Sequence, residues 1–321
     1  MRTVFGLDFG TTNSALSVSS QGNTEVIDID PHNPTEKTMR SVIFFGQDKG
    51  VYLGQEAIVQ YIEQGGDGRF LQSIKSFLPS TLFEYTSING KRYELEEVIA
   101  IILKTIKKRG EDFLGREVTD VVMGRPVIFS EDSYKDHLAE GRLKRAAEIA
   151  GFKNIAFQME PVAAALTFEH SLGKGREKVV LIGDFGGGTS DFTVIKLTGG
   201  KSGLPDRAGD ILSLGGVSIA GDAFDSRLMW EKIAKYFGRN VRYKSMTDQW
   251  LDMPSPITFK LINWHLIPQL RKNSIREALR HIKMTADDAA AIGNLENLIE
   301  DNNGFMLFQA IEKAKIELSY Y

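Results

Sequence analysis

The sequence predicts an α/β protein of two related lobes, and three observations carry this prediction. A glycine-rich phrase occurs twice in one register, as VFGLDFGTTNSALSV at residues 4–18 and as VLIGDFGGGTSDFTV at residues 180–194. Strand-like runs and segments with helical spacing of apolar residues both occur along the chain. A chain of 321 residues is long enough for two compact lobes.

Each copy of the phrase predicts a strand-turn-strand hairpin. An apolar run leads to an Asp, a tight turn of Gly, Thr and Ser follows, and an alternating run leaves the turn. Without gaps, Asp8 falls on Asp184 and Ser14 falls on Ser190. An ordinary hairpin turn explains either copy alone, but it gives no reason for the Asp and Ser to recur in place. The repeat therefore predicts two similar halves.

The turns have the chemistry of phosphate-binding loops. Glycines permit positive φ and let backbone N–H groups approach a ligand closely, and the neighbouring hydroxyls add donors. Asp8 and Asp184, which open the turns, would repel a phosphate unless a cation lay between them. Because Mg²⁺ keeps several waters and binds one or two carboxylates plus phosphate oxygens, a magnesium nucleotide satisfies both requirements.

The elements between and after the hairpins follow from periodicity and capping. Ser130 is expected to cap one helix, Pro161 lies in the first turn of another, and Asn89-Gly90 predicts a short hairpin. Strands are expected at 41–47, 51–58, 118–123, 155–158 and 211–219. Helices are expected at 95–114, 130–150, 162–170, 257–270 and 274–284.

Composition limits the class of protein. The formal net charge of −3 gives no reason to expect nucleic acid, and the absence of cysteine excludes disulfides and thiolate metal sites. The first residues run straight into a strand without a basic-apolar signal segment, and the longest apolar runs are too short to span a bilayer. We therefore expect a cytoplasmic protein with neither a membrane nor nucleic acid as partner.

The order of motifs resembles the nucleotide-binding domain of the 70-kilodalton heat-shock (DnaK-type) chaperones. The first hairpin is followed by EPVAAA at 160–165, then DFGGGTSD at 184–191 and AGDAFD at 220–225. That family belongs to the actin, hexokinase and heat-shock ATPase superfamily. Within it, Lys75 in SIKSFLP and Glu160 point to the chaperone branch, and the overall character resembles a divergent bacterial group labelled YegD-like.

The resemblance implies an actin-like ATPase fold, related to ribonuclease H, in which each lobe has a mixed β-sheet flanked by helices. Lobe I would span 1–178 with an insert at about 37–117, and lobe II would span 179–321 with a helical insert at about 225–310. The family's next segments lie past Tyr321, so we expect a second lobe truncated at its C-terminus. A substrate-binding domain would follow beyond residue 321.

The resemblance also implies a role for each site residue. Lys75 would reach the γ-phosphate and the attacking water, Glu160 would orient that water or accept its proton, and Asp191 would support the second loop. Asp8 and Asp184 would hold Mg²⁺ through its water shell. The nucleotide would be bound by Gly10, Thr11, Thr12, Asn13, Gly186, Gly187, Gly188, Thr189 and Gly221.

The last helix carries the implied adenosine contacts. Glu312, Lys315 and Ser319 are spaced i, i+3 and i+7, so they share one helical face, and the resemblance assigns them to the ribose and adenine. Two departures bear on binding. Asn13 stands where the family commonly has tyrosine, which affects γ-phosphate contacts or the use of a monovalent ion such as K⁺, and Ile316 stands where an arginine packs on the adenine.

The implied function is a slow Mg²⁺-dependent ATPase that binds ATP and ADP and couples nucleotide state to lobe closure in a chaperone. A co-chaperone or exchange factor is the implied partner, although the long insert puts exchange-factor binding in doubt. The alternatives are a module that senses ATP without turnover, disfavoured by Lys75 and Glu160, and an actin-like filament protein, disfavoured by the lysine segment. A sugar or acetate kinase would need an acceptor pocket, for which no residues are evident.

Overall fold

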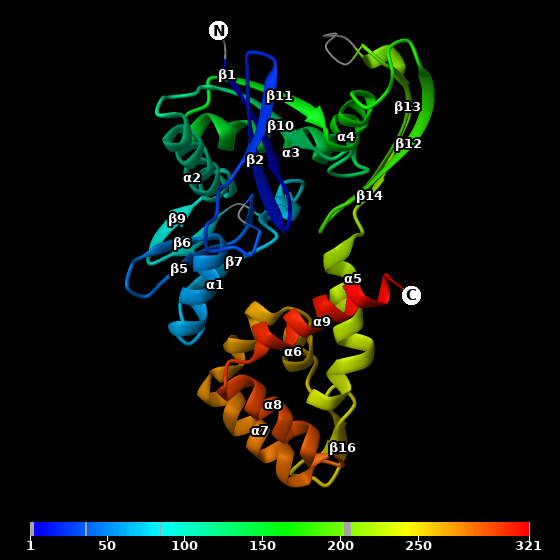
Figure 1. Ribbon diagram of the computed structural model, residues 1–321. Coiled ribbons are helices and arrows are strands. Elements are labelled where there is room, and N and C mark those ends of the chain that lie inside the picture. Colours follow the sequence, from blue (N-terminus) through cyan, green and yellow to red (C-terminus); the bar gives the residue numbers. More distant parts are fainter. Residues whose placement is uncertain (1–2, 36, 84, 202–206, 321) are drawn as a thin grey trace. The chain divides into compact units, whose positions relative to one another are not determined.

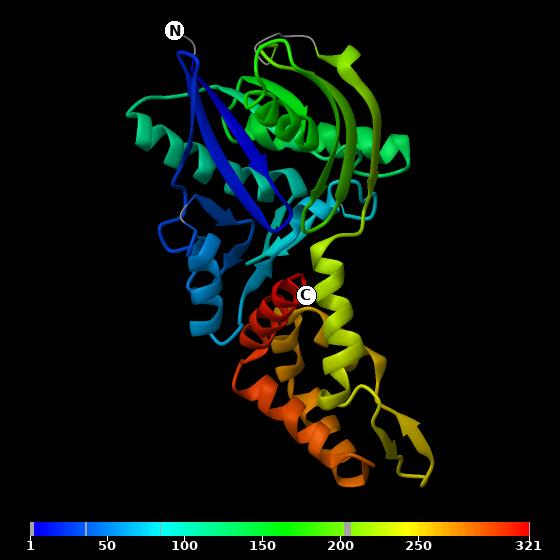
Figure 2. The same cartoon turned by 45° about the vertical axis from the view of Figure 1, so that its right-hand side comes forward.

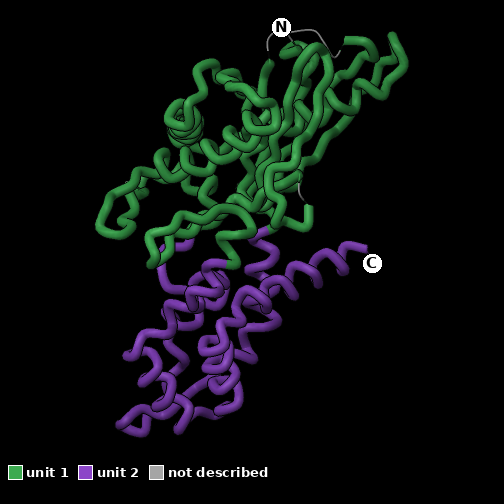
Figure 3. Tube along the Cα trace, turned by 60° about the vertical axis from the view of Figure 1, so that its left-hand side comes forward, with its two compact units in different colours: residues 1–59, 71–221 green, residues 60–70, 222–321 purple. Residues whose placement is uncertain are grey.

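A computed structural model describes residues 3–35, 37–83, 85–201 and 207–320. The chain forms two compact units, the first from residues 1–59 and 71–221 and the second from residues 60–70 and 222–321 (Figure 3). These units do not follow the predicted lobes, and the boundary at 178/179 and the inserts at 37–117 and 225–310 stay predictions.

The first unit is built on a mixed sheet that contains the first hairpin (Figure 1). Its strand order is β11-β10-β1-β2-β3, with β4 beside β2. The strand β1 runs antiparallel to β2 and parallel to β10, so the sheet is mixed as predicted. The bounds are β1 Thr3–Phe9, β2 Asn13–Ser20, β3 Asn23–Ile27, β4 Thr38–Arg40, β10 Asp120–Arg125 and β11 Asn154–Met159.

One face of this sheet forms the main core. Alternate residues of β1, namely Phe5, Leu7 and Phe9, are buried against the helices α2 (Leu95–Leu114) and α3 (Ser133–Ile149), which lie on this side of the sheet (Figure 2). The helix α2 packs very close to the strand β2 at Gly110, because a Cβ on that glycine would lie 2.6 Å from Leu16 Cδ2. The opposite face of the sheet is therefore left for the site.

The start of α3 corrects one expectation. Asp132, not Ser130, is the N-cap, because its carboxylate accepts the backbone N–H groups of Tyr134 and Lys135. The hydroxyl of Ser130 instead accepts the N–H of Asp132. The predicted cap thus lies two residues before the actual one.

Two short hairpins follow the first sheet. In the first, β5 (Ile43–Phe45) pairs with β6 (Val51–Leu53), and in the second, β8 (Thr86–Ile88) pairs with β9 (Lys91–Tyr93). Asn89 and Gly90 have φ of 50° and 79°, as a two-residue turn of this hand requires, so that hairpin is confirmed.

The strand expected at 51–58 is wrong after Leu53. The helix α1 (Gly54–Glu63) begins there, and Ala57, Ile58 and Tyr61 are buried at helical spacing. The backbone N–H of Gln55 in its first turn donates to Asp30 Oδ2 at 3.0 Å. A buried carboxylate distant in sequence thus satisfies the helix start, which local alternation could not reveal.

The second hairpin forms its own antiparallel sheet. Its strands β12 (Glu177–Phe185), β13 (Ser190–Thr198) and β14 (Ile211–Val217) lie in that order. The helix α4 (Glu160–Glu169) covers one face, where Val162 and Ala165 pack with Ile195 and Leu197. Because α4 follows β11 directly, it connects the first sheet to the second.

The second unit is mostly helical around its own apolar core. The helix expected at 257–270 is broken, because Asn263 is extended, with φ −138° and ψ 114°, and Pro268 cannot donate an N–H. The helix expected at 274–284 is confirmed as α7. Its elements are α5 Gly221–Leu228, a π-helix Met229–Ile233, a 3₁₀ turn Ala234–Phe237, β15 Arg242–Lys244, β16 Trp250–Asp252, α6 Ser255–Thr258, 3₁₀ segments Phe259–Ile262 and Trp264–Arg271, α7 Asn273–Thr285, α8 Ala289–Glu300 and α9 Gly304–Leu318. The strand β7 (Arg69–Leu71) belongs to the three-stranded sheet of order β6-β5-β7. None of the helices in the described ranges is long and apolar enough to cross a membrane.

A buried ion pair fastens the end of α4 to the second sheet. Both guanidinium Nη atoms of Arg207 donate to the carboxylate of Glu169 at 2.7 Å, and the N–H of Thr198 donates to the same carboxylate. The Glu169 side chain is fully buried, and the hydrogen bonds from Arg207 hold its pKa below the ordinary value. Removing one partner of such a pair leaves a buried charge uncompensated.

We predict that Glu169→Gln lowers the free energy of unfolding by about 3 kcal/mol at pH 7. Because the pKa of Glu169 is lowered by folding, its contribution is complete above its ordinary value of 4.5 and is lost as the pH falls through the folded value. Urea unfolding of both proteins should therefore give a gap that narrows in acid. Glu148→Gln, which removes an exposed pair with Arg145, is the matched control and should cost less than about 1 kcal/mol. Equal losses in the two variants would contradict the prediction.

Candidate functional site

The two glycine turns touch each other. A Cβ on Gly188, in the turn between β12 and β13, would lie 2.7 Å from Thr11 Oγ1 in the turn between β1 and β2. The strands leave both turns in matching register, with Asp8 opposite Ala15 and Asp184 opposite Asp191. Segments more than a hundred and seventy residues apart are thus brought together as a pair.

Each turn is closed by its own backbone. In the first, a Cβ on Gly10 would lie 2.2 Å from the carbonyl oxygen of Asn13, so only glycine fits. In the second, the N–H of Gly186 donates to Thr189 O at 3.0 Å, and the N–H of Gly221 donates to Gly186 O at 3.1 Å. The predicted residue Gly221 is therefore held against the second turn, at the start of α5.

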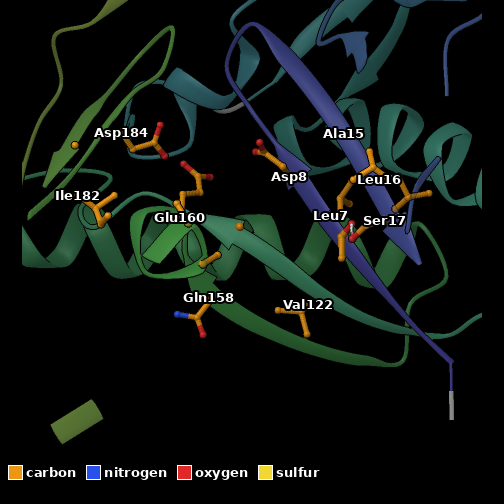
Figure 4. Close-up of a pocket in the computed structure, with 16 residues that line it drawn as sticks. Leu7, Asp8, Ala15, Leu16, Ser17, Val122, Gln158, Glu160, Ile182 and Asp184 are labelled. Carbon is orange, nitrogen blue, oxygen red and sulfur yellow. Dashed lines mark hydrogen bonds between the residues drawn. The ribbon is translucent and has the colours of Figure 1, made fainter. Parts of the chain in front are cut away.

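A cavity of about 480 Å³ lies between the open face of the first sheet, α4 and β12 (Figure 4). The carboxylates of Asp8, Glu160 and Asp184 point toward it. Small residues supply much of the rest of its wall: Gly6, Ala15, Gly124, Ala163, Ala164 and Gly183. The acidic side chains are thereby gathered at one end of a hollow with a largely apolar wall.

Lys75 and Glu160 form a direct ion pair, although 85 residues separate them. Nζ of Lys75 donates to Glu160 Oε1 at 2.8 Å, and the two side chains are only 7% and 17% exposed. Lys75 lies in a 3₁₀ turn (Ile74–Phe77) that follows Ser73 in a left-handed conformation, and Glu160 is the first residue of α4. The ammonium therefore comes from the start of a short 3₁₀ turn and the carboxylate from the start of α4.

Gly124 is a site residue that the sequence reasoning missed. A Cβ at this position, near the end of β10, would lie 3.1 Å from both Cγ and Oε1 of Glu160. Gly124 therefore leaves just enough room for the glutamate to reach Lys75. A glycine placed where a buried strand ends is the only signal for it in the sequence.

The site carries an excess of negative charge. Asp8 opens into the cavity, yet protein surrounds most of its carboxyl group, and this burial raises its pKa to about 6, with Glu160 and Asp184 raising it further and Lys75 opposing the shift. Burial also raises the pKa of Asp184, with added repulsion from Glu160 and Asp191 and again with Lys75 in opposition. A site of this kind favours a bound cation, because a cation would relieve the repulsion.

Asp191 is a buried residue just after the second turn. It is 1% exposed, and its Oδ1 accepts the N–H of Val127 at 2.7 Å, which ties the second hairpin to the segment after β10. Burial raises the pKa of Asp191, while hydrogen bonds from Thr189 and Val127 oppose the shift. These contacts fit the predicted support of the second loop by Asp191.

The implied adenosine residues lie at the end of the second unit, on α9 and at its C-cap. On α9, Lys315 Nζ donates to Asp225 Oδ2 of α5 at 2.7 Å. The hydroxyl of Ser319, the C-cap of α9, donates to Lys315 O at 3.0 Å and so turns back on its own helix. Glu312 and Lys315, one turn apart, keep the expected common face, and Ile316 beside them is 49% exposed.

The residues present fit a hydrated magnesium ion better than a directly caged one. Within the part of the chain that the structure describes, His, Cys, Asp and Glu form no group of three that could hold a metal ion. Asp8 and Asp184 instead meet at the cavity as two carboxylates beside glycine-lined turns. Mg²⁺ binds in this way when substrate phosphates and water supply the remaining ligands.

The profile of the family described as "Hsp70 protein" matches residues 4–251. This match includes both glycine turns, Lys75 and Glu160. The chain belongs to the Hsp70 family. Two similar proteins, each named "Chaperone protein DnaK", come from Thermosipho melanesiensis and Thermosipho africanus, and each is 31% identical over 244 residues. The alignment covers 74% of this chain and 37% of each relative, so the chain spans less than half the length of the curated relatives it matches.

Membership assigns the pair of turns to a nucleotide-binding domain of the Hsp70 type, with the actin-like ATPase fold that the motifs predict. The matched residues end at 251, before α9, so the Hsp70 profile includes the phosphate side of the expected site and not Glu312, Lys315 or Ser319. The finer placement in a YegD-like group stays a prediction.

We predict that the Asp8 carboxyl of this Hsp70 chain titrates near pH 6 when no ligand is bound. Glu160→Gln should lower that midpoint because it removes a repelling charge, and Lys75→Met should raise it because it removes the attracting one. Carbon-13 NMR of labelled aspartate carboxyls measures the titration midpoint of Asp8 in the wild-type protein and in both variants, with Asp8→Asn used to assign the signal. A midpoint near the ordinary value of 3.8 would show that neither burial nor the neighbouring carboxylates perturb Asp8.

Proposed function

We propose that this Hsp70 chain binds Mg-ATP at its two glycine turns, beside the cavity that Asp8, Glu160 and Asp184 line, and hydrolyses it slowly. The observation that carries the proposal is the buried Lys75–Glu160 pair, because it places an ammonium and a carboxylate beside Asp8 and Asp184. A cation, a candidate proton acceptor and two metal-binding carboxylates are the groups that phosphoryl transfer to water needs.

Each group has a task in the proposed reaction. Backbone N–H groups and hydroxyls of Gly10 to Asn13 and of Gly186 to Thr189 bind the phosphate chain. Lys75 sets a positive charge where phosphoryl transfer spreads negative charge, and its bond to Glu160 keeps that carboxylate aimed at the same place. Glu160 orients the attacking water and accepts its proton. Asp8 and Asp184 hold hydrated Mg²⁺, which neutralises charge on the phosphates when bound.

The remaining parts of the proposal rest on the resemblance and on family membership. Glu312, Lys315 and Ser319 bind the adenosine, ADP replaces ATP after turnover, and K⁺ is a further candidate ion near Asn13. Nucleotide state is coupled to closure of the lobes, with a substrate-binding domain, co-chaperone or exchange factor as partner and the cytoplasm as location. The site favours hydrolysis over the ATP-sensing alternative because Lys75 and Glu160 are already paired.

We predict that Lys75→Ala lowers the single-turnover rate of ATP hydrolysis by about 10²-fold, because it removes the charge that stabilises the transition state. Nucleotide affinity should change little, since the backbone of both turns remains. Rapid-quench kinetics and calorimetry measure the two quantities. Lys108→Ala, which removes an exposed lysine of α2, is the matched control and should leave both unchanged. A full rate in Lys75→Ala would remove Lys75 from the chemistry.

We predict that Asp8→Asn and Asp184→Asn weaken Mg-nucleotide binding much more than binding measured with a chelator. The reason is that the lost charge faces the hydrated cation. Titration calorimetry with and without Mg²⁺ gives the comparison. Similar losses in both conditions would mean that these aspartates serve the hairpins and not the metal.

A further inference from the structure

The 3₁₀ turn that presents Lys75 has, at both ends, a backbone conformation that the local sequence disfavours. Ser73, just before the turn, is left-handed, with φ of 51° and ψ of 34°, and residues other than glycine rarely adopt this conformation. Leu78, just after the turn, is right-handed helical, with φ of −52° and ψ of −44°. Pro79 follows it, and a proline disfavours this region for the residue before it. Contacts with the rest of the first unit therefore hold the turn in place.

Arg142 of α3 binds the carbonyl groups at the end of this turn. Its Nη1 donates to Leu78 O at 3.0 Å and to Ser80 O at 2.7 Å, and its Nη2 donates to Phe83 O at 3.2 Å. The last carbonyls of a helical segment have no partner within it, and an arginine is one of the side chains that can satisfy them. Ile74 and Leu78 are buried in the main core. Apolar packing thus holds the body of the turn, and Arg142 holds its end.

Glu96 fixes the direction of the Arg142 guanidinium. Its Oε1, in the first turn of α2, lies 3.4 Å from Arg142 Nε, and the side chains of Arg142 and Glu96 are 14% and 18% exposed. The carboxylate compensates the charge of this partly buried cation. A planar guanidinium holds several acceptors in fixed directions, which a single ammonium cannot do. Arg142 is therefore a rigid connection from α2 and α3 to the carbonyls that follow the turn.

The position of the turn determines where the Lys75 ammonium lies. The N–H of Leu78 donates to Lys75 O at 3.1 Å, so a single residue joins Arg142 to the backbone of Lys75. The ammonium reaches Glu160 Oε1 at 2.8 Å, and the Lys75 side chain is only 7% exposed. A four-residue 3₁₀ turn has few hydrogen bonds of its own, and their geometry is poor. Release of its end would therefore let Lys75 move away from Glu160.

We propose that Arg142 is a positioning residue that holds the turn, and with it the pair of Lys75 and Glu160, in the arrangement that hydrolysis requires. The proposal rests on the proposed function, because Lys75 acts there on the phosphate. It adds a residue of α3, a helix to which the motif reasoning gave no part in the site. Arg142 acts only through the turn and need not touch the nucleotide.

The first experiment tests the positioning without any nucleotide. Acetic anhydride labelling of Lys75, measured by peptide mass spectrometry, should rise about fivefold in Arg142→Met, because local opening of the turn exposes a buried amine. Lys107, which is also buried in the first unit but pairs with Glu111, is the internal reference and should not change. Unchanged labelling of Lys75 would overturn the proposal. An equal rise at Lys107 would do so too, because it would show a general loosening of the unit.

Two further variants complete the labelling experiment. Arg142→Lys keeps the positive charge beside Glu96 but cannot span the carbonyls, so its Lys75 labelling should lie between those of the wild type and Arg142→Met. This milder change still tests the proposal if Arg142→Met does not fold. Arg109→Met is the matched control, because Arg109 of α2 donates to a main-chain carbonyl elsewhere in the first unit, that of Ile29. It should leave the labelling of Lys75 at the wild-type level.

The second experiment tests the consequence for the reaction. Single-turnover hydrolysis of Mg-ATP should be about tenfold slower in Arg142→Met, because a small displacement of Lys75 weakens its contact with the transition state. The dissociation constant of Mg-ATP, measured by calorimetry, should stay near the wild-type value, since both glycine turns remain intact. Adding Arg142→Met to Lys75→Ala should slow the reaction no further, because the two residues act as one unit.

The outcomes separate positioning from stability. An equal fall in rate in Arg109→Met, or a further fall when Arg142→Met is added to Lys75→Ala, would show that Arg142 acts through general stability and would refute the assignment. If the wild-type chain does not hydrolyse ATP, the proposed function fails and the effect on the rate falls with it. The labelling of Lys75 still decides the positioning in that case.

Discussion

The site depends on the contact between the two glycine turns. Gly188 can lie against Thr11 only because it has no side chain. This contact lets the hairpin β1-β2 and the hairpin β12-β13 lie close together at their turns. Asp8 and Asp184 therefore line the same cavity, because each lies two residues before the first glycine of its own turn. A larger residue at 188 would separate the turns and with them the carboxylates.

Bringing these carboxylates together has an electrostatic cost. Asp8, Glu160 and Asp184 repel one another in a partly buried space, and Lys75 is the cation that opposes the resulting pKa shifts. Such an arrangement is unfavourable for stability alone and favourable for binding a cation with a polyanion. The fold offsets the cost with the well-packed apolar core on the far side of the first sheet.

The helix α4 gives this arrangement its connectivity. It begins at Glu160, which faces Lys75, and ends at Glu169, which is locked to Arg207. Along its length it packs on the second sheet, although it follows a strand of the first. One short helix therefore links the group proposed to orient water to the hairpin that contains Asp184. In the second unit, one ion pair joins Lys315 of α9 to Asp225 of α5.

The sequence by itself determined the hairpins, because strand alternation, glycine turns and in-register aspartates are local patterns that their recurrence in one register reinforces. It also determined the Hsp70 family, through Lys75 and Glu160 beside those motifs. It did not determine the helix that begins at Gly54, whose first turn depends on Asp30 far back along the chain. It also did not determine the cap at Asp132 or the break at Asn263, where two local signals compete and periodicity does not choose between them. The pairing of Lys75 with Glu160, the room left by Gly124 and the bond from Lys315 to Asp225 were decided by tertiary structure alone. Each joins residues tens of positions apart, and periodicity along a chain contains no information about such distances.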